Sequence, residues 1–369
     1  MHNFRHVFSS LNPKSNRIIR FRRNARGENG RRDKLTRMLP QLELLLPPRW
    51  KFTAILGALL LSALPGGHAQ TANAPGQTAS DAGSSGPAKS APIEIHGSIR
   101  SRFEMWDWFG SGGESAYGYS GNLVKLSFAR AGKHANWKVE LAAPILLGLP
   151  DDALAAGARG QLGLGASYYA ANDRKGSAAG IFPKQAYLEF HHLGARQQHG
   201  IKIGRFEFAD GTELTPKNAT LAALKRTRVN QRLLGTFAFS HVGRSFDGAH
   251  YSWNGKASNV TVVGATPTRG VFQTDGWGWN RVAFAYGAYS HGFTAAKSAS
   301  EVRVFSVFYS DFRDVLKTDN RPLAIRQADT ERINITSFGG HFIHAAETPG
   351  GTLDLLAWGV GQTGSWGLQ

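Results

Sequence analysis

The feature that most constrains this chain is a two-residue alternation of apolar and polar side chains that begins at Ile93. Over residues 93–105 one face is apolar and the other polar: Ile93, Ile95, Ile99, Phe103 and Met105 against Glu94, His96, Arg100, Arg102 and Glu104. This period is typical of a β-strand. It also continues beyond the five or six residues usual in soluble strands. The segment therefore predicts a long strand with one apolar face.

Similar segments recur along the rest of the chain, and we expect about eleven strands. They lie near residues 93–106, 122–130, 136–143, 184–192, 199–206, 246–254, 258–266, 281–290, 301–310, 333–345 and 352–363. Their connections alternate between short segments, such as 255–257, and long ones, such as 207–245. Short turns at one end and long loops at the other are typical of outer-membrane β-barrels.

A membrane location agrees with the remaining hydrophobic pattern. No run of twenty apolar residues exists, which excludes helical membrane spans. A closed barrel pairs every backbone polar group without such a run, so a mean hydropathy of −0.28 is acceptable. Aromatic residues near the expected strand ends predict an interfacial girdle. They are Trp106, Trp108, Tyr168, Tyr169, Trp253, Trp277, Trp279, Tyr286, Tyr289 and Trp358.

The first 69 residues predict a basic leader with a signal peptide. Arg49 and Lys51 precede a thirteen-residue apolar segment, 52–64, and Pro65 to Ala69 then supply a helix break and small residues. That order is typical of a secretory signal, although a buried core helix remains an alternative, and either Met1 or Met38 is the true start. Residues 70–92 contain almost no large apolar side chains and predict a disordered linker.

The basic composition is concentrated in this leader. Of the net charge of +17, residues 1–37 contribute +9, and residues 70–369 contribute +7. The basic block has no aromatic-interleaved pattern, so we expect no nucleic-acid partner. The absence of cysteine excludes disulfides, cysteine-bound metals and a thiol nucleophile.

Three stretches carry a resemblance to a known family: residues 100–108 (RSRFEMWDW), 140–172 and, above all, 204–248. Together with 265–272 and 319–322, they resemble the alginate-export family of outer-membrane porins. The resemblance implies a monomeric transmembrane antiparallel β-barrel of eighteen strands with an arginine-lined, anion-selective lumen. Because only about eleven strands are expected, residues 93–369 would form an alginate-export-type domain that is C-terminally incomplete.

The long segment 207–245 is the most informative for selectivity. Asn218 is placed to cap a helix, and Arg226, Arg228 and Arg232 follow. On one continuous helix, Arg228 and Arg232 share a face and Arg226 turns aside. Arginine binds planar carboxylates through two parallel hydrogen bonds, which suits a polyuronate. An outer helix face that neutralises lipopolysaccharide phosphates remains the alternative.

Cations on the polar faces of strands form a second group, because an arginine facing lipid costs about 2–4 kcal/mol at the membrane midplane. Lys138 and Arg281 belong to this group, and some members will pair with acidic neighbours. The full set expected to contact substrate in the lumen is Arg100, Arg102, Lys202, Arg205, Arg226, Arg228, Arg232 and Arg303.

The sequence therefore predicts an outer-membrane channel for anionic polysaccharide or oligosaccharide. We expect no enzymatic activity, cofactor or metal, and expect a monomer surrounded by outer-membrane lipid and lipopolysaccharide. A barrel-embedded hydrolase remains the alternative, because His241, Ser245, Asp247 and His250 lie close in sequence. His191, His192 and His199 leave a metal site open, and a soluble β-sandwich lectin is a third possibility. Neither the sugar nor the direction of transport follows from the sequence.

Overall fold

The computed structural model describes residues 92–107, 116–155, 160–275, 278–319 and 321–367. These residues belong to one compact unit, Gly86–Gln369. The expected leader, its signal peptide and all but the last residue of the expected linker lie outside the described part. Trp108 and Trp277, two members of the expected aromatic girdle, lie outside it as well.

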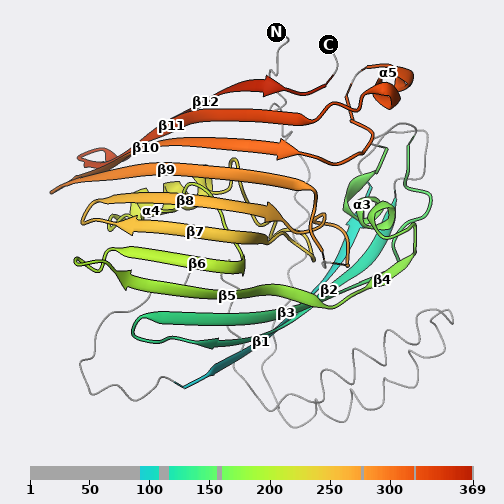
Figure 1. Cartoon of the computed structure of the whole chain (residues 1–369), viewed down its shortest axis with the longest axis horizontal. Helices are drawn as coiled ribbons and strands as arrows, with labels where there is room; N and C mark the ends of the chain where they lie inside the picture. The colour runs from blue at the N-terminus through green and yellow to red at the C-terminus, as the bar shows by residue number, and fades with distance from the viewer. Residues whose placement is uncertain (1–91, 108–115, 156–159, 276–277, 320, 368–369) are drawn as a thin grey trace, which may run out of the picture. The chain divides into compact units, whose positions relative to one another are not determined.

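The described residues form one antiparallel sheet of twelve strands. Eleven of them follow one another in chain order, and short β4 (Ser177–Ala179) pairs only with β3 (Figure 1). The other strands are β1 (Glu94–Trp106), β2 (Tyr117–Arg130), β3 (Ala135–Leu147), β5 (Phe182–Leu193), β6 (His199–Phe206), β7 (Phe246–Asn254), β8 (Ser258–Pro267), β9 (Val282–Ala295), β10 (Ser298–Asp311), β11 (Ile333–Thr348) and β12 (Gly351–Ser365).

The predicted all-β antiparallel class is confirmed, and each of the eleven expected strands is present. Two details differ. β2 begins at Tyr117, earlier than predicted. The first residues of this strand were not recognised in the sequence because Gly118, Ser120 and Gly121 interrupt the apolar alternation. β4 lies within a connection that was expected to contain no strand. Within the described residues, β1 pairs only with β2 and β12 only with β11, so the sheet is not closed between them.

The connections alternate in length as predicted. Short turns join β2 to β3, β5 to β6, β7 to β8, β9 to β10 and β11 to β12, and longer segments occupy the opposite end of the sheet. Where the structure describes them, the long segments hold four short helices: α3 (Gly163–Ala171), α4 (Ala219–Leu224), the π-helix η2 (Lys225–Val229) and α5 (Leu323–Ala328). No helix in the described part of the chain is long and apolar enough to cross a membrane.

The two faces of the sheet differ in chemistry, and strand register assigns each residue to one face. The outer face carries exposed apolar side chains on nearly every strand; for example, Ile99 on β1 is 56 % exposed and Phe338 on β11 is 55 % exposed. Others, related to these by register, are Leu126, Val139, Leu188, Ile203, Val262, Tyr289, Val304 and Leu355. The inner face carries the buried core and most of the strand charges.

This division corrects part of the predicted aromatic girdle. Tyr286 lies on the inner face of β9, and Tyr168 lies in α3; both are almost fully buried. Proximity to a strand end does not show which face an aromatic ring occupies, because successive side chains alternate between faces. Among the girdle residues that the structure describes, Trp279 and Tyr289 have substantially exposed side chains.

Candidate functional site

The segment between β6 and β7, residues 207–245, lies against the inner face and contacts strands far apart in the sheet. We call it the constriction loop. Arg100 of β1 donates hydrogen bonds to the carbonyl oxygens of Ala238 (3.0 Å) and Ser240 (2.6 Å). Lys225, in the same loop, binds Glu301 of β10. Because β2, β3 and β5 to β9 separate β1 from β10, the sheet must curve around this loop.

Local chemistry shapes the helical part of the constriction loop. The side chain of Asn218 accepts a hydrogen bond from the Leu221 amide (2.9 Å), so the predicted N-cap is confirmed. α4 continues into η2, which ends at Val229, and Gln231 then has a φ of 62°. The helix is therefore shorter than predicted, and the expected shared face of Arg228 and Arg232 does not apply.

Three arginines of this loop reach solvent. Arg226 and Arg228 belong to η2, and Arg232 follows it; all three are exposed. Arg232 donates a hydrogen bond to the carbonyl oxygen of Arg228, and its guanidinium lies 5.1 Å from the ring of Trp358 on β12. Within the described residues none of the three forms an ion pair with a carboxylate, so their charge is available to a solute.

Buried charges fasten one side of the constriction loop to β10, and we call them the latch. Its members are Asp210, Glu213 and Lys225 of the loop with Glu301 and Arg303 of β10. Nη2 of Arg303 lies 3.0 Å from Glu213 and 3.4 Å from Asp210, and Nζ of Lys225 lies 2.7 Å from Glu301. Arg303 is only 1 % exposed, so it serves the latch and is not available to solute.

The two loop carboxyl groups beside Arg303 differ in their titration. Burial raises the pKa of Asp210, and the backbone hydrogen bonds and Arg303 only partly oppose it. Burial also acts on Glu213, but Arg303 and a hydrogen bond from the Tyr286 hydroxyl outweigh it and lower the pKa of this carboxyl. The pKa values of the two carboxyl groups therefore move in opposite directions, although both groups lie beside the same guanidinium.

The other side of the constriction loop is fastened to β1 and α3. Nη2 of Arg102 donates to the carbonyl oxygen of Phe239 (2.6 Å) and lies 3.1 Å from Nε2 of His241. The Tyr168 hydroxyl accepts a hydrogen bond from the His241 amide (2.7 Å). Burial, followed by the charges of Arg102 and Arg100, lowers the pKa of His241 to about 3. The imidazole is therefore neutral at physiological pH.

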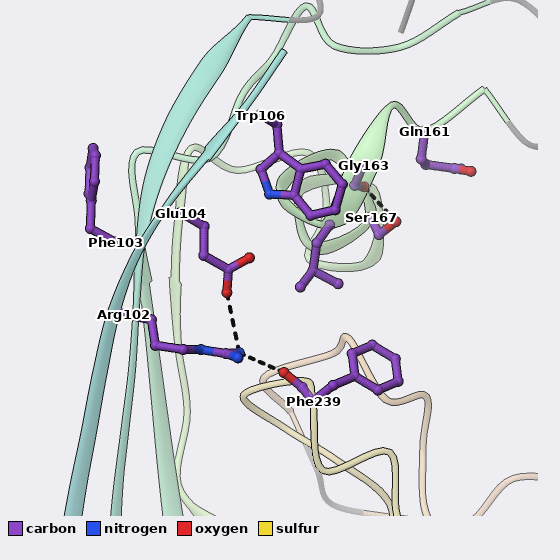
Figure 2. Close-up of a pocket in the computed structure, with 9 residues that line it drawn as sticks. Arg102, Phe103, Glu104, Trp106, Gln161, Gly163, Ser167 and Phe239 are labelled. Atoms are coloured by element: carbon purple, nitrogen blue, oxygen red, sulfur yellow. Dashed lines mark hydrogen bonds and ion pairs between the residues drawn. The ribbon is translucent and has the colours of Figure 1, made fainter. Parts of the chain in front are cut away.

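A cavity of about 660 Å³ lies between β1, α3 and the constriction loop (Figure 2). Arg102 and Glu104 form an ion pair on its β1 side (3.3 Å), and the Tyr119 hydroxyl donates to Glu104 (2.8 Å). Trp106, Gln161, Gly163, Leu164, Ser167 and Phe239 line the cavity with Phe103. Because the arginine and glutamate neutralise each other, this cavity offers hydrogen bonds and aromatic surface but no net charge.

The remaining predicted cations have separate roles. Lys202 faces inward, 3.3 Å from Glu189, and lies over the ring of Tyr187. Arg205 shares the outer face with Ile203 and binds Asp247. Arg100 and Arg102 hold the constriction loop. Of the eight predicted cations, Arg226, Arg228 and Arg232 are therefore the accessible ones, and they lie in one loop. The other five are bound to protein groups, buried, or on the outer face of the sheet.

Lys138 of β3, predicted to face inward, pairs with its acidic neighbour Glu140 at 3.0 Å. Two further inner-face cations were not predicted, and one of them, Lys125 of β2, contacts the same carboxylate at 3.3 Å. Lys184 of β5 lies 3.5 Å from Glu207 of the constriction loop. The inward orientation of Lys125 could have been predicted, because it alternates with the apolar Leu126. Strand register places these two residues on opposite faces of the sheet. Lys184 follows a proline and lacks such a pattern.

The residues of the hydrolase alternative are engaged elsewhere. The Ser245 hydroxyl donates to the carbonyl oxygen of Lys184 (2.6 Å), and Asp247 accepts hydrogen bonds from Nε and Nη2 of Arg205. His191 and His192 contact each other, whereas His199 contacts Tyr251. Among the described residues, no group of three or more histidine, aspartate or glutamate side chains is arranged to hold a metal ion.

Comparison with known proteins gives distant structural neighbours only. No family model matches the chain, and no curated protein matches it. The Pseudomonas putida OprB structure at high pH aligns with a TM-score of 0.35 and 9 % identity, over 70 % of this chain and 71 % of OprB. Pseudomonas aeruginosa OccK9 (OpdG) aligns with a TM-score of 0.33 and 12 % identity, over 74 % of this chain and 64 % of OccK9.

Both neighbours are outer-membrane porins, and this chain spans less than two thirds of the second. Likeness at these TM-scores carries no argument about function. What the chain's own structure defines is an antiparallel sheet with an apolar outer face, a charged inner face and a loop folded against that inner face. The resemblance to the alginate-export family stays a prediction.

Proposed function

We propose that this chain forms an outer-membrane channel in which the constriction loop narrows the pore and attracts anionic polysaccharide or oligosaccharide. The observation that carries the proposal is the attachment of this loop to β1 on one side and β10 on the other, across the inner face. A loop fastened in this way lies within the curve of the sheet. Any solute that follows the inner face must pass it.

The outer face supports the membrane location. Exposed apolar side chains occur on almost every strand there, whereas soluble proteins seldom expose contiguous apolar patches of more than a few hundred Å². Membrane barrels have this arrangement, with apolar residues toward lipid and polar residues toward the lumen. The alternation of short turns and long loops agrees with it.

The three accessible arginines support anion selectivity. Cations in a narrow passage with low-dielectric walls raise the local concentration of anions. A polyuronate presents one carboxylate per sugar, and each guanidinium binds a carboxylate through two hydrogen bonds. Transport requires sites that release the solute as well as bind it, and exposed side chains on a loop meet that need better than buried ones. The alginate-like substrate rests on the family resemblance.

Planar-bilayer recording tests the proposal. The full chain is reconstituted as wild type, as the Arg226→Gln/Arg228→Gln/Arg232→Gln triple variant, and as Arg196→Gln, an exposed arginine in the short turn between β5 and β6. We expect the triple variant to lose anion preference in its reversal potential and to lose block by oligouronates, whereas Arg196→Gln keeps both. Unchanged selectivity in the triple variant contradicts the role of the arginines. Absence of conductance from correctly inserted wild type contradicts the channel.

A further inference from the structure

A polar group interrupts the apolar outer face of the sheet. Arg205 of β6, Asp247 of β7 and Thr266 of β8 are direct neighbours in strand register. Register places them on the same face as the exposed Ile203 and Val262. An ion pair on a lipid-facing surface is costly at the membrane midplane and inexpensive near an interface, so its position along the strands is informative.

That position is at the end of the sheet where the long loops lie. β6 ends at Phe206, one residue beyond Arg205, and β7 begins at Phe246, one residue before Asp247. In outer-membrane barrels the longer loops face the exterior. In the proposed outer-membrane barrel, Arg205 and Asp247 therefore lie at the level of the outer-leaflet headgroups.

Arg205 and Asp247 form a bidentate ion pair, and both side chains retain groups that can form further hydrogen bonds. Nε and Nη2 of Arg205 each donate to Asp247 at 2.8 Å, and Nη1 donates to the carbonyl oxygen of Pro183 at 3.1 Å. A guanidinium has five N–H groups, so two of Arg205 have no acceptor among the described residues, and the side chain is 10 % exposed. The Asp247 carboxylate likewise retains lone pairs for a hydroxyl donor, and its side chain is 18 % exposed.

A cavity of about 610 Å³ opens beside this pair. Small residues, including Ala186, Gly204 and Gly248, make the depression, and Trp279 borders it with a side chain that is 73 % exposed. Tryptophan is favoured at the headgroup level of membranes because its ring is apolar and its N–H is polar. The depression therefore combines an exposed aromatic ring, a carboxylate and two free guanidinium N–H groups.

We propose that this depression binds the phosphorylated sugar headgroup of lipopolysaccharide, an inference that rests on the proposed outer-membrane location. The ring of Trp279 covers the apolar face of a sugar. Asp247 accepts a hydrogen bond from a sugar hydroxyl, and the free N–H groups of Arg205 donate to a phosphate or hydroxyl oxygen. The acyl chains continue along the apolar outer face past Ile203 and Leu188.

Lipid binding to the full chain tests this site. Wild type, Trp279→Ala, Trp279→Phe and Trp253→Ala are purified from outer membranes in mild detergent. Bound lipopolysaccharide is then measured by native mass spectrometry and by titration with lipid A or phosphatidylglycerol. Trp253 is the matched control, because it lies on the outer face of β7 at the opposite, short-turn end.

We expect Trp279→Ala to weaken lipid A binding by about fivefold or more, as truncation of an aromatic anchor does. Trp279→Phe should lose less, and Trp253→Ala should bind as wild type. Equal binding by Trp279→Ala and wild type overturns the site. Equal losses in both alanine variants, or tighter binding of phosphatidylglycerol, overturn its specificity. The channel proposal is judged separately by conductance, which Trp279→Ala should leave unchanged.

Discussion

Nζ of Lys225 lies 2.7 Å from both carboxylate oxygens of Glu301, and the two side chains are 2 % and 1 % exposed. Nε2 of His341 on β11 approaches the same carboxylate at 3.1 Å. The pair joins the end of α4 to the inner face of β10. It thereby fixes the helical part of the constriction loop, which carries Arg226 and Arg228.

Removal of the lysine charge should release this side of the loop. Lys225→Met leaves Glu301 buried without its main partner, and breaking a buried pair in this way typically costs about 3–5 kcal/mol. We expect lower stability to denaturant in detergent and faster proteolysis within residues 207–245. Lys217→Met removes the same charge from an exposed position in the same loop and should change neither measurement. Equal protease resistance in both variants contradicts the latch.

The other side of the loop depends on the absence of a side chain at Gly121. A Cβ atom there would collide with the imidazole of His241. Gly121→Ala should displace residues near His241, weaken its contact with Arg102 and increase single-channel conductance. Gly287→Ala provides the control, because a Cβ at that glycine meets nothing within 4 Å. A conductance equal to that of the control shows that this part of the loop does not limit the pore.

Acid should loosen the same contact. The pKa of His241 is about 3 in the folded chain against an ordinary 6.5, so the folded state holds this group neutral. Between these values the unfolded or undocked state binds the additional proton. Stability contributed by His241 is therefore present above about pH 6.5 and is lost as the pH falls toward 3. Proteolysis of the loop should accelerate over that range, and His241→Gln should remove that part of the pH dependence. An unaltered pH profile in His241→Gln assigns the dependence to the carboxyl groups of the latch.

The strands were predictable because their signal is local. Apolar and polar side chains alternate within each strand segment, and residues 93–105 show this pattern without information from the rest of the chain. β4 was missed because three small residues, Ser177 to Ala179, carry no alternation. The face of Arg205 was also missed: its charge favours an inward orientation, but strand register and its bond to Asp247 place it outward.

The site was less predictable because its contacts join residues remote in sequence. Lys225 and Glu301 are 76 positions apart, and nothing local in either segment indicates the pairing. Arg303 looked like a pore cation because it alternates with Val302 and Val304. Its burial depends on Asp210 and Glu213, which come from another loop. The prediction that Arg228 and Arg232 share one helix face was wrong because the helix ends at Val229, before Arg232.

The contact between Arg232 and Trp358 gives a last prediction. The ring lies 5.1 Å from the guanidinium and holds it near β12, and a cation–π contact at an exposed site is worth about 0.5–1 kcal/mol. Trp358→Leu should therefore weaken block of the current by oligouronates about two- to fivefold, whereas Trp358→Phe, which keeps an aromatic ring, should weaken it less. If the ring acts through Arg232, Trp358→Leu will have no additional effect on a chain that already carries Arg232→Gln. A full additional loss in that double variant shows that Trp358 acts on the pore independently of Arg232.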